Sequence, residues 1–255
     1  MPVKHLIIPD VQVKPGNDFQ FLTAIGNYIC EKKPDVVIQI GDFADLPSLS
    51  SYDIGKKAFE GKRYKKDIEA VEEAMKALLS PLAEYNGKAV KNHHKLYNPL
   101  RLLTLGNHEN RIDRVVESDP KLDGTIGLKD LKYEEFGWQV VPFLQPTVVH
   151  GVAYCHYFTS GVMGRPVASA RHLITKKHMS ATMGHVQNWD MAREVRADGK
   201  PILALFSGSC YEHNEDDLGP QGNTYDRGIW MKNEVEDGHY QPMFVSLKYL
   251  KENYL

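Results

Sequence analysis

The sequence has few cysteines, no long apolar run and no strong excess of charge of either sign. The three cysteines, Cys30, Cys155 and Cys210, are widely separated and form no CxxC pair. An odd, scattered set does not predict a disulfide framework, so a reducing compartment is the simpler expectation. No stretch approaches the roughly 20 apolar residues that a membrane-spanning helix needs, and residues 1–5 show no signal-peptide pattern. We therefore expect a cytoplasmic protein with no membrane partner.

The charge is nearly balanced, with a formal net charge of −2 and a pI of about 6.6. Proteins that grip long nucleic acid by its backbone usually carry a basic excess, so any nucleic-acid contact here is expected to be local. The 255 residues, of which 42% are hydrophobic and 25% charged, suit a folded α/β protein. With no repeat, low-complexity tract or linker, we expect one domain over residues 1–255.

Apolar runs and helical spacing divide the chain into two halves of different character. The first half predicts buried strands at 6–8, 36–40 and 100–105, and helices at 19–31, 63–85 and 110–118. This order favours a parallel sheet. The second half predicts one helix at 165–177 and short strands near 138–141, 147–150, 152–156, 179–183, 191–196, 202–207 and 243–247. Residues 43–62 are expected to form a long polar loop.

Four polar clusters follow the ends of predicted strands. They are Asp10-x-Gln12, Gly41-Asp42-x-x-Asp45, Gly106-Asn107-His108-Glu109 and Gly184-His185-x-Gln187, and His156 follows a further strand. Loops beyond the carboxyl ends of the strands converge on one crevice in open α/β sheets. Asp, Asn, His and Gln side chains gathered there suit a divalent metal ion, and the preceding glycines allow the chain to turn sharply where a side chain would crowd the ligands.

The order of these clusters resembles the calcineurin-like metallophosphoesterases, whose blocks run D-x-H, GD-x-x-D, GNH-E/D, a lone His and GH-x-H. The segment from Tyr154 to Pro166 resembles the bacteriophage-encoded branch. The resemblance implies an α/β fold, a four-layer α/β/β/α sandwich with two mixed sheets. It also implies two divalent metal ions, a phosphate-ester substrate and, for a phage protein, a place in the host cytoplasm.

The resemblance assigns a role to each matching residue. Asp42 matches the carboxylate that bridges both ions, and Asp10 matches a ligand of one of them. The other ion's remaining ligands match Asn107, His156 and His185, and Asn107 is also expected to contact substrate. His108 matches a histidine that binds no metal and protonates the leaving oxygen.

Two positions depart from the family pattern. Gln12 and Gln187 stand where the family has histidines, and both belong to the ion that Asp10 would hold. Together with Asp42 they would form an all-oxygen ligand set, which suits Mn²⁺ or Mg²⁺, whereas the histidine-containing site also admits Fe or Zn. The alternative is that neither glutamine binds metal.

In the mechanism that the resemblance implies, two ions about 3.5–4 Å apart lower the pKa of a shared water, which then attacks phosphorus, with His108 as general acid.

The glycine-rich turn before the predicted 165–177 helix could present N–H groups to an anion. Ser160 and Arg165 are therefore candidate substrate-binding residues, with helix capping as the alternative. His150 is an alternative to His156 as a metal ligand.

A phosphodiesterase or nuclease acting on nucleotides, DNA or RNA is the leading hypothesis. It rests on the family's common substrates and on basic and aromatic residues that alternate in one loop: Tyr52, Lys56, Lys57, Phe59, Lys62, Arg63 and Tyr64. A phosphomonoesterase is the nearest alternative, although Leu46 replaces the arginine that the protein-phosphatase branch carries after the second aspartate. A third reading is a binding scaffold that has lost catalysis, favoured by Gln12 and Gln187 and opposed by the intact motifs.

Overall fold

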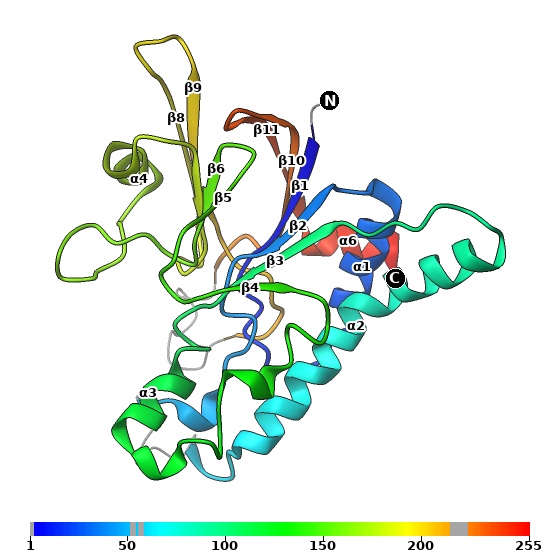
Figure 1. The fold of residues 1–255 in the computed structure, drawn as a ribbon, viewed down its shortest axis with the longest axis vertical. Coiled ribbons are helices and arrows are strands. Elements are labelled where there is room, and N and C mark those ends of the chain that lie inside the picture. Colours follow the sequence, from blue (N-terminus) through cyan, green and yellow to red (C-terminus); the bar gives the residue numbers. More distant parts are fainter. Residues whose placement is uncertain (1–2, 52–54, 56–58, 215–223) are drawn as a thin grey trace.

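Two mixed β-sheets face each other, and helices cover the outer face of each (Figure 1). The computed structural model describes residues 3–51, 55, 59–214 and 224–255. This arrangement confirms the predicted α/β fold, a four-layer α/β/β/α sandwich. Within the described ranges, no helix combines the length and the apolar character needed to cross a membrane.

The first sheet has the strand order β11-β10-β1-β2-β3-β4. Four of its strands run parallel: β1 (Val3–Ile8), β2 (Val36–Gln39), β3 (Leu100–Thr104) and β4 (Gln139–Val141). An antiparallel hairpin of β10 (Gly228–Glu236) and β11 (His239–Ser246) pairs with β1. The parallel strands point their carboxyl ends to the same edge, as the order of the polar clusters predicted.

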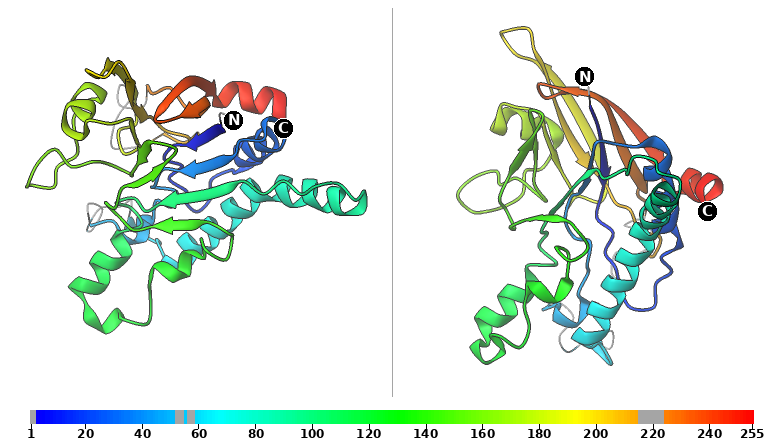
Figure 2. Two further views of the ribbon diagram at one scale, coloured as in Figure 1. Left: turned by 45° about the horizontal axis from the view of Figure 1, so that its top comes forward. Right: turned by 45° about the vertical axis from the view of Figure 1, so that its right-hand side comes forward.

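Three helices cover the outer face of this sheet, and they lie on the side of the molecule away from α4 (Figures 1 and 2). They are α1 (Gln20–Lys32), α2 (Tyr64–Lys91) and α6 (Leu247–Tyr254). Gly26 lets α1 approach α2 closely, because an added Cβ would lie 2.4 Å from the carbonyl oxygen of Leu78. Helix α2 continues past residue 85, where the sequence predicted its end, to Lys91, and Pro81 lies inside it.

The second sheet has the order β5-β6-β7-β9-β8, with its central three strands parallel. The strands are β5 (Thr147–Val149), β6 (Val152–Tyr154), β7 (Ala181–Met183), β8 (Trp189–Val195) and β9 (Pro201–Ser207). Helix α4 (Ala170–Lys177) packs on its outer face. A helix α3 (Arg111–Ser118) and 3-10 turns at Pro47–Leu49, Pro120–Leu122 and Leu128–Leu131 complete the described elements.

Helix α4 begins five residues later than the sequence predicted. Ser169 caps it, because its Oγ accepts a hydrogen bond from the His172 N–H at 3.2 Å. The preceding turn closes on itself through a bridge between Thr159 and Pro166. The prediction of a helix from Arg165 was wrong because the cap and the turn are set by these contacts.

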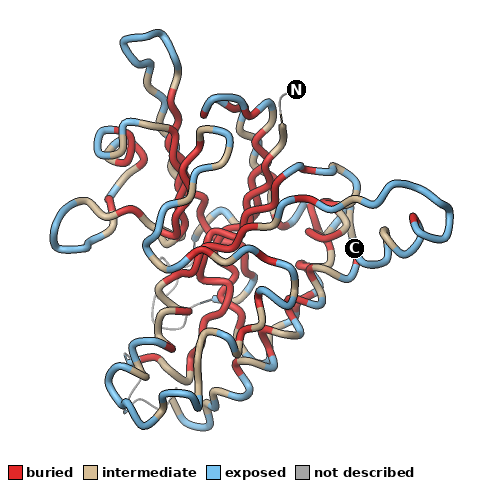
Figure 3. Tube along the Cα trace, in the orientation of Figure 1, coloured by how far each residue is buried: buried red, intermediate tan, exposed pale blue. Residues whose placement is uncertain are grey.

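Alternate residues of each central strand pack on opposite sides of the first sheet. In β1, Leu6 and Ile8 contact the helix layer, whereas Ile7 faces the second sheet. The central strands are buried while the outer loops are exposed (Figure 3). Burial on both faces explains why these strands appear as continuous apolar runs in the sequence.

A lysine is buried between the two sheets. Lys232 of β10 has no exposed surface, and its Nζ donates hydrogen bonds to the hydroxyls of Tyr154 and Thr182. The rings of Tyr154 and Tyr240 lie 4.7 and 4.1 Å from the same nitrogen. Burial lowers the pKa of Lys232 well below its usual value, so the neutral form is favoured inside the fold.

A buried histidine predicts a loss of stability in acid. Burial lowers the pKa of His5 to about 3, and its Nδ1 lies 2.7 Å from the Tyr154 hydroxyl. Between pH 6.5 and 3 the unfolded chain therefore binds a proton that the folded chain excludes. The stabilisation is present above pH 6.5 and is lost as pH falls, by up to roughly 1.4 kcal/mol per pH unit.

Urea unfolding between pH 7 and pH 4 measures this effect. The free energy of unfolding should fall less steeply with pH in His5→Gln than in the wild type. His239→Gln removes an exposed histidine and should leave the slope unchanged. Equal slopes for the wild type and His5→Gln would contradict the prediction.

Candidate metal centre

Polar side chains from both sheets meet where the carboxyl ends of the parallel strands converge. The His185 N–H donates to Asp10 Oδ2 at 3.1 Å, joining the segment after β7 to the segment after β1. His156 Nδ1 lies 3.0 Å from the carbonyl oxygen of Ile40, joining the segment after β6 to the end of β2. The second sheet therefore brings its histidines to the acidic edge of the first.

Four potential ligands converge at this point. Ligand atoms of Asp42, His156 and His185 all lie within 4.8 Å of one another. Asn107 Oδ1 lies 3.0 Å from His156 Nε2 and 2.8 Å from His185 Nδ1, and Asp42 Oδ2 lies 3.3 Å from His156 Nε2. A carboxylate, an amide oxygen and two imidazole nitrogens form a donor set that fits a divalent transition-metal ion.

Asp10 and Gln187 lie beside these four residues. Asp10 is fully buried, and its Oδ2 accepts a hydrogen bond from Gln187 Nε2 at 3.0 Å. Gln187 Oε1 is buried and has no hydrogen-bond partner among the described residues. Because a buried carbonyl oxygen normally has a partner, this orphaned oxygen beside a buried carboxylate fits a cation.

Gln12, the remaining candidate ligand, also lies next to Asp42. The Gln12 N–H donates to the Asp42 carbonyl oxygen at 2.9 Å, and 7% of Gln12 is exposed. Gln12, Asp42 and His185 all adopt left-handed backbone conformations, with φ of 48°, 48° and 67°. Such conformations are costly for residues other than glycine and concentrate at functional sites.

At the motif glycines, a side chain would collide with a candidate ligand. A Cβ at Gly106 would lie 2.0 Å from Asp42 Oδ1, and one at Gly184 would lie 2.3 Å from Asp10 Oδ1. Neither Gly106 nor Gly184 has a positive φ, whereas Gly41 does, at 99°. A side chain at any of the three would crowd a candidate ligand, as the sequence predicted, since a Cβ at Gly41 would lie 2.6 Å from His156 Nδ1. A turn that needs a positive φ is present only at Gly41 among the three.

Glu109 ties together the loops that follow β2 and β3. Its buried carboxylate accepts hydrogen bonds from the N–H groups of Asp42, Ala44 and Gly106 at 2.9–3.0 Å. The Tyr133 hydroxyl donates a fourth at 3.2 Å. The sequence showed Glu109 only as the last residue of the GNHE motif, because three of its four donors lie far from it along the chain.

His108 faces the cluster from the side. Its Nδ1 lies 2.7 Å from Asp45 Oδ1, and its Nε2 lies 3.7 Å from Asp42 Oδ2. Burial lowers the pKa of His108, but the negative charges of Asp42 and Asp45 outweigh burial and raise it above the usual value. With Nδ1 directed at Asp45, Nε2 is the nitrogen on the side of Asp42 and of Arg111, whose Nη2 lies 3.1 Å away.

Burial and neighbouring charges shift the pKa values of the candidate ligand residues. Burial raises the pKa of Asp10 to about 7, with Asp42 adding to the effect. Burial and the charge of His156 lower the pKa of His185 to about 4. Burial by itself lowers the pKa of His156, but the negative charge of Asp42 outweighs burial and raises the pKa to about 9. Buried carboxylates and imidazoles in such close contact are the kind of group that a bound cation stabilises.

Ser160 and Arg165 lie in the turn between β6 and α4. The carbonyl oxygen of Arg165 accepts hydrogen bonds from the Ser160 N–H at 2.8 Å and the Ser160 hydroxyl at 3.2 Å. Since α4 starts at Ala170, this turn does not form its N-terminus, and Ser169 is the capping residue. Substrate binding by Ser160 and Arg165 stays a prediction, and neither the helix-terminus argument nor the capping alternative applies to them.

Two further sequence expectations change with the structure. The segment expected to be a polar loop begins with buried residues, among them Phe43, Ala44 and Leu46. Tyr52, Lys56 and Lys57 lie outside the described residues, and the Tyr64 hydroxyl donates to Asp130 at 2.8 Å. His150, the alternative metal ligand, has its Nδ1 2.8 Å from His5 Nε2 instead.

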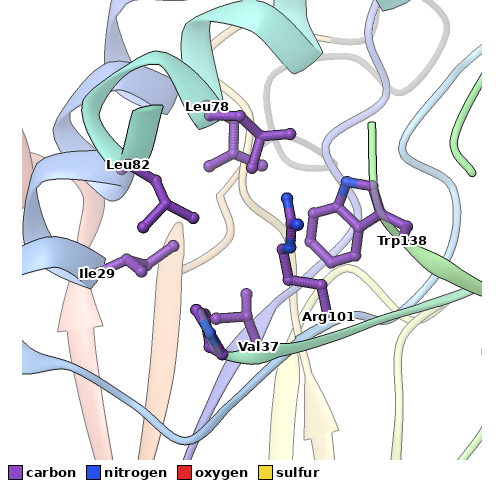
Figure 4. A pocket seen from close by; sticks show the side chains of 9 residues that line it. Ile29, Val37, Leu78, Leu82, Arg101 and Trp138 are labelled. Atoms are coloured by element: carbon purple, nitrogen blue, oxygen red, sulfur yellow. The ribbon is translucent and has the colours of Figure 1, made fainter. Parts of the chain in front are cut away.

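Two spaces are lined by residues other than the candidate ligands. A pocket of about 250 Å³ is lined by residues that include Val11, Phe19, Tyr211 and His213, none of them a candidate ligand. A space of about 10 Å³ lies between α1, α2 and the first sheet, beside Arg101 and the other side chains of Figure 4. This second space holds at most about one water molecule, so it is no substrate site.

A sandwich of two mixed sheets with carboxylate, amide and imidazole groups at its strand ends defines a metallophosphoesterase. The family model described as "Calcineurin-like phosphoesterase" matches residues 3–221. The chain therefore belongs to the calcineurin-like phosphoesterase family, which are metal-dependent hydrolases of phosphate esters. The predicted family is confirmed.

Two phage proteins are similar to this chain. The Gene 54 protein of Mycobacterium phage L5 is 29% identical over 147 residues, which cover 56% of this chain and 52% of that protein. The Gene 54 protein of Mycobacterium phage D29 is 35% identical over 88 residues, covering 34% and 33%. These matches are consistent with the predicted phage-encoded branch, and each spans about half or less of the relative's length.

Among solved structures, the chain is similar to purple acid phosphatase PPD1 from yellow lupin seeds. The alignment covers 97% of this chain and 52% of that chain, with 10% sequence identity and a TM-score of 0.38. A similarity this low carries no argument about substrate, so the fold assignment rests on the two sheets themselves.

Proposed function

We propose that this chain hydrolyses phosphodiester bonds in nucleotides or nucleic acid, using a water activated by two divalent metal ions. The observation that carries the proposal is the convergence of Asp42, Asn107, His156 and His185, with His108 facing them. Two bound ions supply an activated water and neutralise charge on the phosphate. Similarity to phage proteins favours the host cytoplasm as the place of action.

The chain's own residues divide into two ligand sets and one proton donor. Asn107, His156 and His185 would hold one ion together with Asp42. Asp10, Asp42, Gln12 and Gln187 would hold the other, and an all-oxygen set of this kind favours Mn²⁺ or Mg²⁺. The unpaired Gln187 Oε1 beside Asp10 supports this second set.

His108 is placed to hold a proton at the leaving oxygen. Asp45 lies 2.7 Å from Nδ1 and orients the ring, so that Nε2 is directed at the substrate side. A positioned imidazole of this kind contributes general acid catalysis. Asn107, which precedes it, would also contact the substrate.

A polyanionic substrate is supported by the charge of one stretch of the chain that holds two candidate ligands. Residues 136–189 contain no aspartate or glutamate, although the whole chain has a net charge of −2. The same span carries Arg165, Arg171, Lys176 and Lys177, and it includes the candidate ligands His156 and His185. Arg171 is paired with Glu194 of β8 at 3.1 Å and lies on α4 with the two lysines, which leaves Arg165, in the turn that follows β6, as the cation of this stretch outside that helix. A local positive charge attracts phosphate backbones.

Hydrolysis of bis(p-nitrophenyl) phosphate and of p-nitrophenyl phosphate, each with added Mn²⁺, tests the proposal. We expect diester turnover by the wild type and a reduction of about 10²- to 10⁴-fold in His108→Ala, with unchanged metal content. His94→Ala, which removes an exposed histidine, is the control and should behave as the wild type.

Each other outcome has a distinct meaning. Turnover of the monoester alone would identify a phosphomonoesterase. A folded, metal-containing protein that cleaves neither compound would identify a binding scaffold. Cleavage of single-stranded DNA or RNA oligonucleotides under the same conditions would extend the diesterase result to nucleic acid.

A further inference from the structure

The guanidinium of Arg111 lies at the rim of the metal centre. Arg111 is the first residue of α3, the helix that follows the GNHE motif, and 15% of its side chain is exposed. Its Nη2 lies 3.1 Å from His108 Nε2, which in turn lies 3.7 Å from Asp42 Oδ2. Arg111 therefore reaches the side of the centre that His108 faces.

The other terminal nitrogen of Arg111 is firmly anchored. Nη1 donates to the carbonyl oxygen of Asp45 at 2.7 Å and to that of Leu46 at 3.4 Å, and it lies 3.3 Å from Asp45 Oδ1. Three oxygens around one nitrogen hold the planar group in a single orientation. A guanidinium fixed on one side can present its remaining N–H groups to an anion at little further entropic cost.

Asp45 has two other partners that can balance its negative charge, so Arg111 is not needed for that purpose alone. Asp45 Oδ2 lies 3.4 Å from Lys14 Nζ, and Asp45 Oδ1 lies 2.7 Å from His108 Nδ1. The acidic groups of the centre include Asp10, Asp42 and Glu109 as well. A phosphate that approaches this edge meets negative charge, and a guanidinium aimed at the same place supplies a charge-assisted hydrogen bond.

We propose that Arg111 is a substrate-binding residue that donates from Nη2 to a non-bridging oxygen of the substrate phosphate. In the structure this N–H faces His108 Nε2 at 3.1 Å, and because a guanidinium only donates, it turns from Nε2 to the phosphate oxygen when substrate binds, which frees Nε2 to carry a proton. Nη1 remains on Asp45 and Leu46, so the anchored guanidinium sets the position of the phosphate relative to His108. Inorganic phosphate, which has the same oxygens, binds at the same place. This inference rests on the proposed phosphoester hydrolysis.

Titration calorimetry of inorganic phosphate into the metal-loaded protein tests Arg111 directly. We expect Arg111→Ala to raise the dissociation constant for phosphate and the KM for the aryl diester by about 10- to 100-fold, the value of a charge-assisted hydrogen bond. Metal content and unfolding temperature should stay close to those of the wild type. Arg114→Ala, an exposed arginine of the same helix, should bind phosphate normally.

Two further measurements separate substrate binding from a purely structural role. Added guanidinium ion should restore part of the lost phosphate affinity in Arg111→Ala. Arg111→Lys keeps the charge but lacks the planar fork, so its phosphate affinity should lie between those of the wild type and Arg111→Ala. If Arg111→Ala does not fold, the lysine variant carries the test.

An unchanged phosphate affinity in both Arg111 variants, with only kcat lowered, would overturn the inference and make Arg111 a positioning residue for His108. Absence of phosphate binding by the wild type would overturn it as well. Arg111-dependent phosphate binding by a wild type that cleaves no ester would refute the proposed function and leave this inference standing.

Discussion

Asp42→Asn is expected to abolish hydrolysis and to release bound metal. Asp42 Oδ2 lies 3.3 Å from His156 Nε2, and Asp42 Oδ1 accepts the His108 N–H at 2.9 Å. Burial opposes the charge of Asp42, but His108 and His156 outweigh burial and hold its pKa well below the usual range. An amide removes this anionic charge from the residue predicted to bridge both ions, a loss on the order of 10³-fold or more in turnover.

The metal content of the dialysed protein and the rate of diester cleavage measure the result. Asparagine has the shape of aspartate, so Asp42→Asn should fold with nearly the same secondary structure. Asp113→Asn, at an exposed position of α3, is the matched control and should keep both metal and activity. Wild-type metal content and turnover in Asp42→Asn would contradict the proposed ligand role.

Glu109→Gln is expected to destabilise the protein and weaken its metal binding, although Glu109 is not a predicted ligand. The buried carboxylate accepts from four donors, among them the N–H groups of Asp42 and Gly106. A glutamine amide accepts through one oxygen only, and its NH₂ would face donors. Leaving such donors unsatisfied costs roughly 2–4 kcal/mol in the free energy of unfolding.

Urea unfolding of the metal-free protein measures the stability, and competition with a chelator measures the metal affinity. Glu117→Gln, an exposed glutamate in α3, should match the wild type in both. An unchanged free energy of unfolding in Glu109→Gln would show that the loops after β2 and β3 are held together without this carboxylate.

Elements with strong local patterns were predicted from the sequence, and weak ones were missed. The buried parallel strands were found because their apolar runs are continuous. The strand β10 was missed because its apolar run, Ile229 to Met231, is only three residues long and is followed by the polar residues Lys232 to Glu234. A lysine at this position would suggest a solvent-exposed segment, yet the fold buries Lys232 against the rings of Tyr154 in the second sheet and Tyr240 in β11.

The short helix α6 was also missed, for a related reason. It spans eight residues and buries only Leu247 and Leu250, too few for helical periodicity to show. Its start is set by Ser246, whose Oγ accepts from the Tyr249 N–H at 3.2 Å. Packing on α1 stabilises it, and this contact joins the last helix of the chain to the first.

The sequence by itself determined the family, the fold class and the residue types of the candidate centre, because motif spacing and strand ends are local properties of the chain. The tertiary structure decided which side chains actually meet. It directed His150 to His5 and brought His156 to Asp42, and it revealed the contacts of Glu109 and Arg111. These outcomes depend on how the two sheets face each other, and no local pattern encodes that geometry.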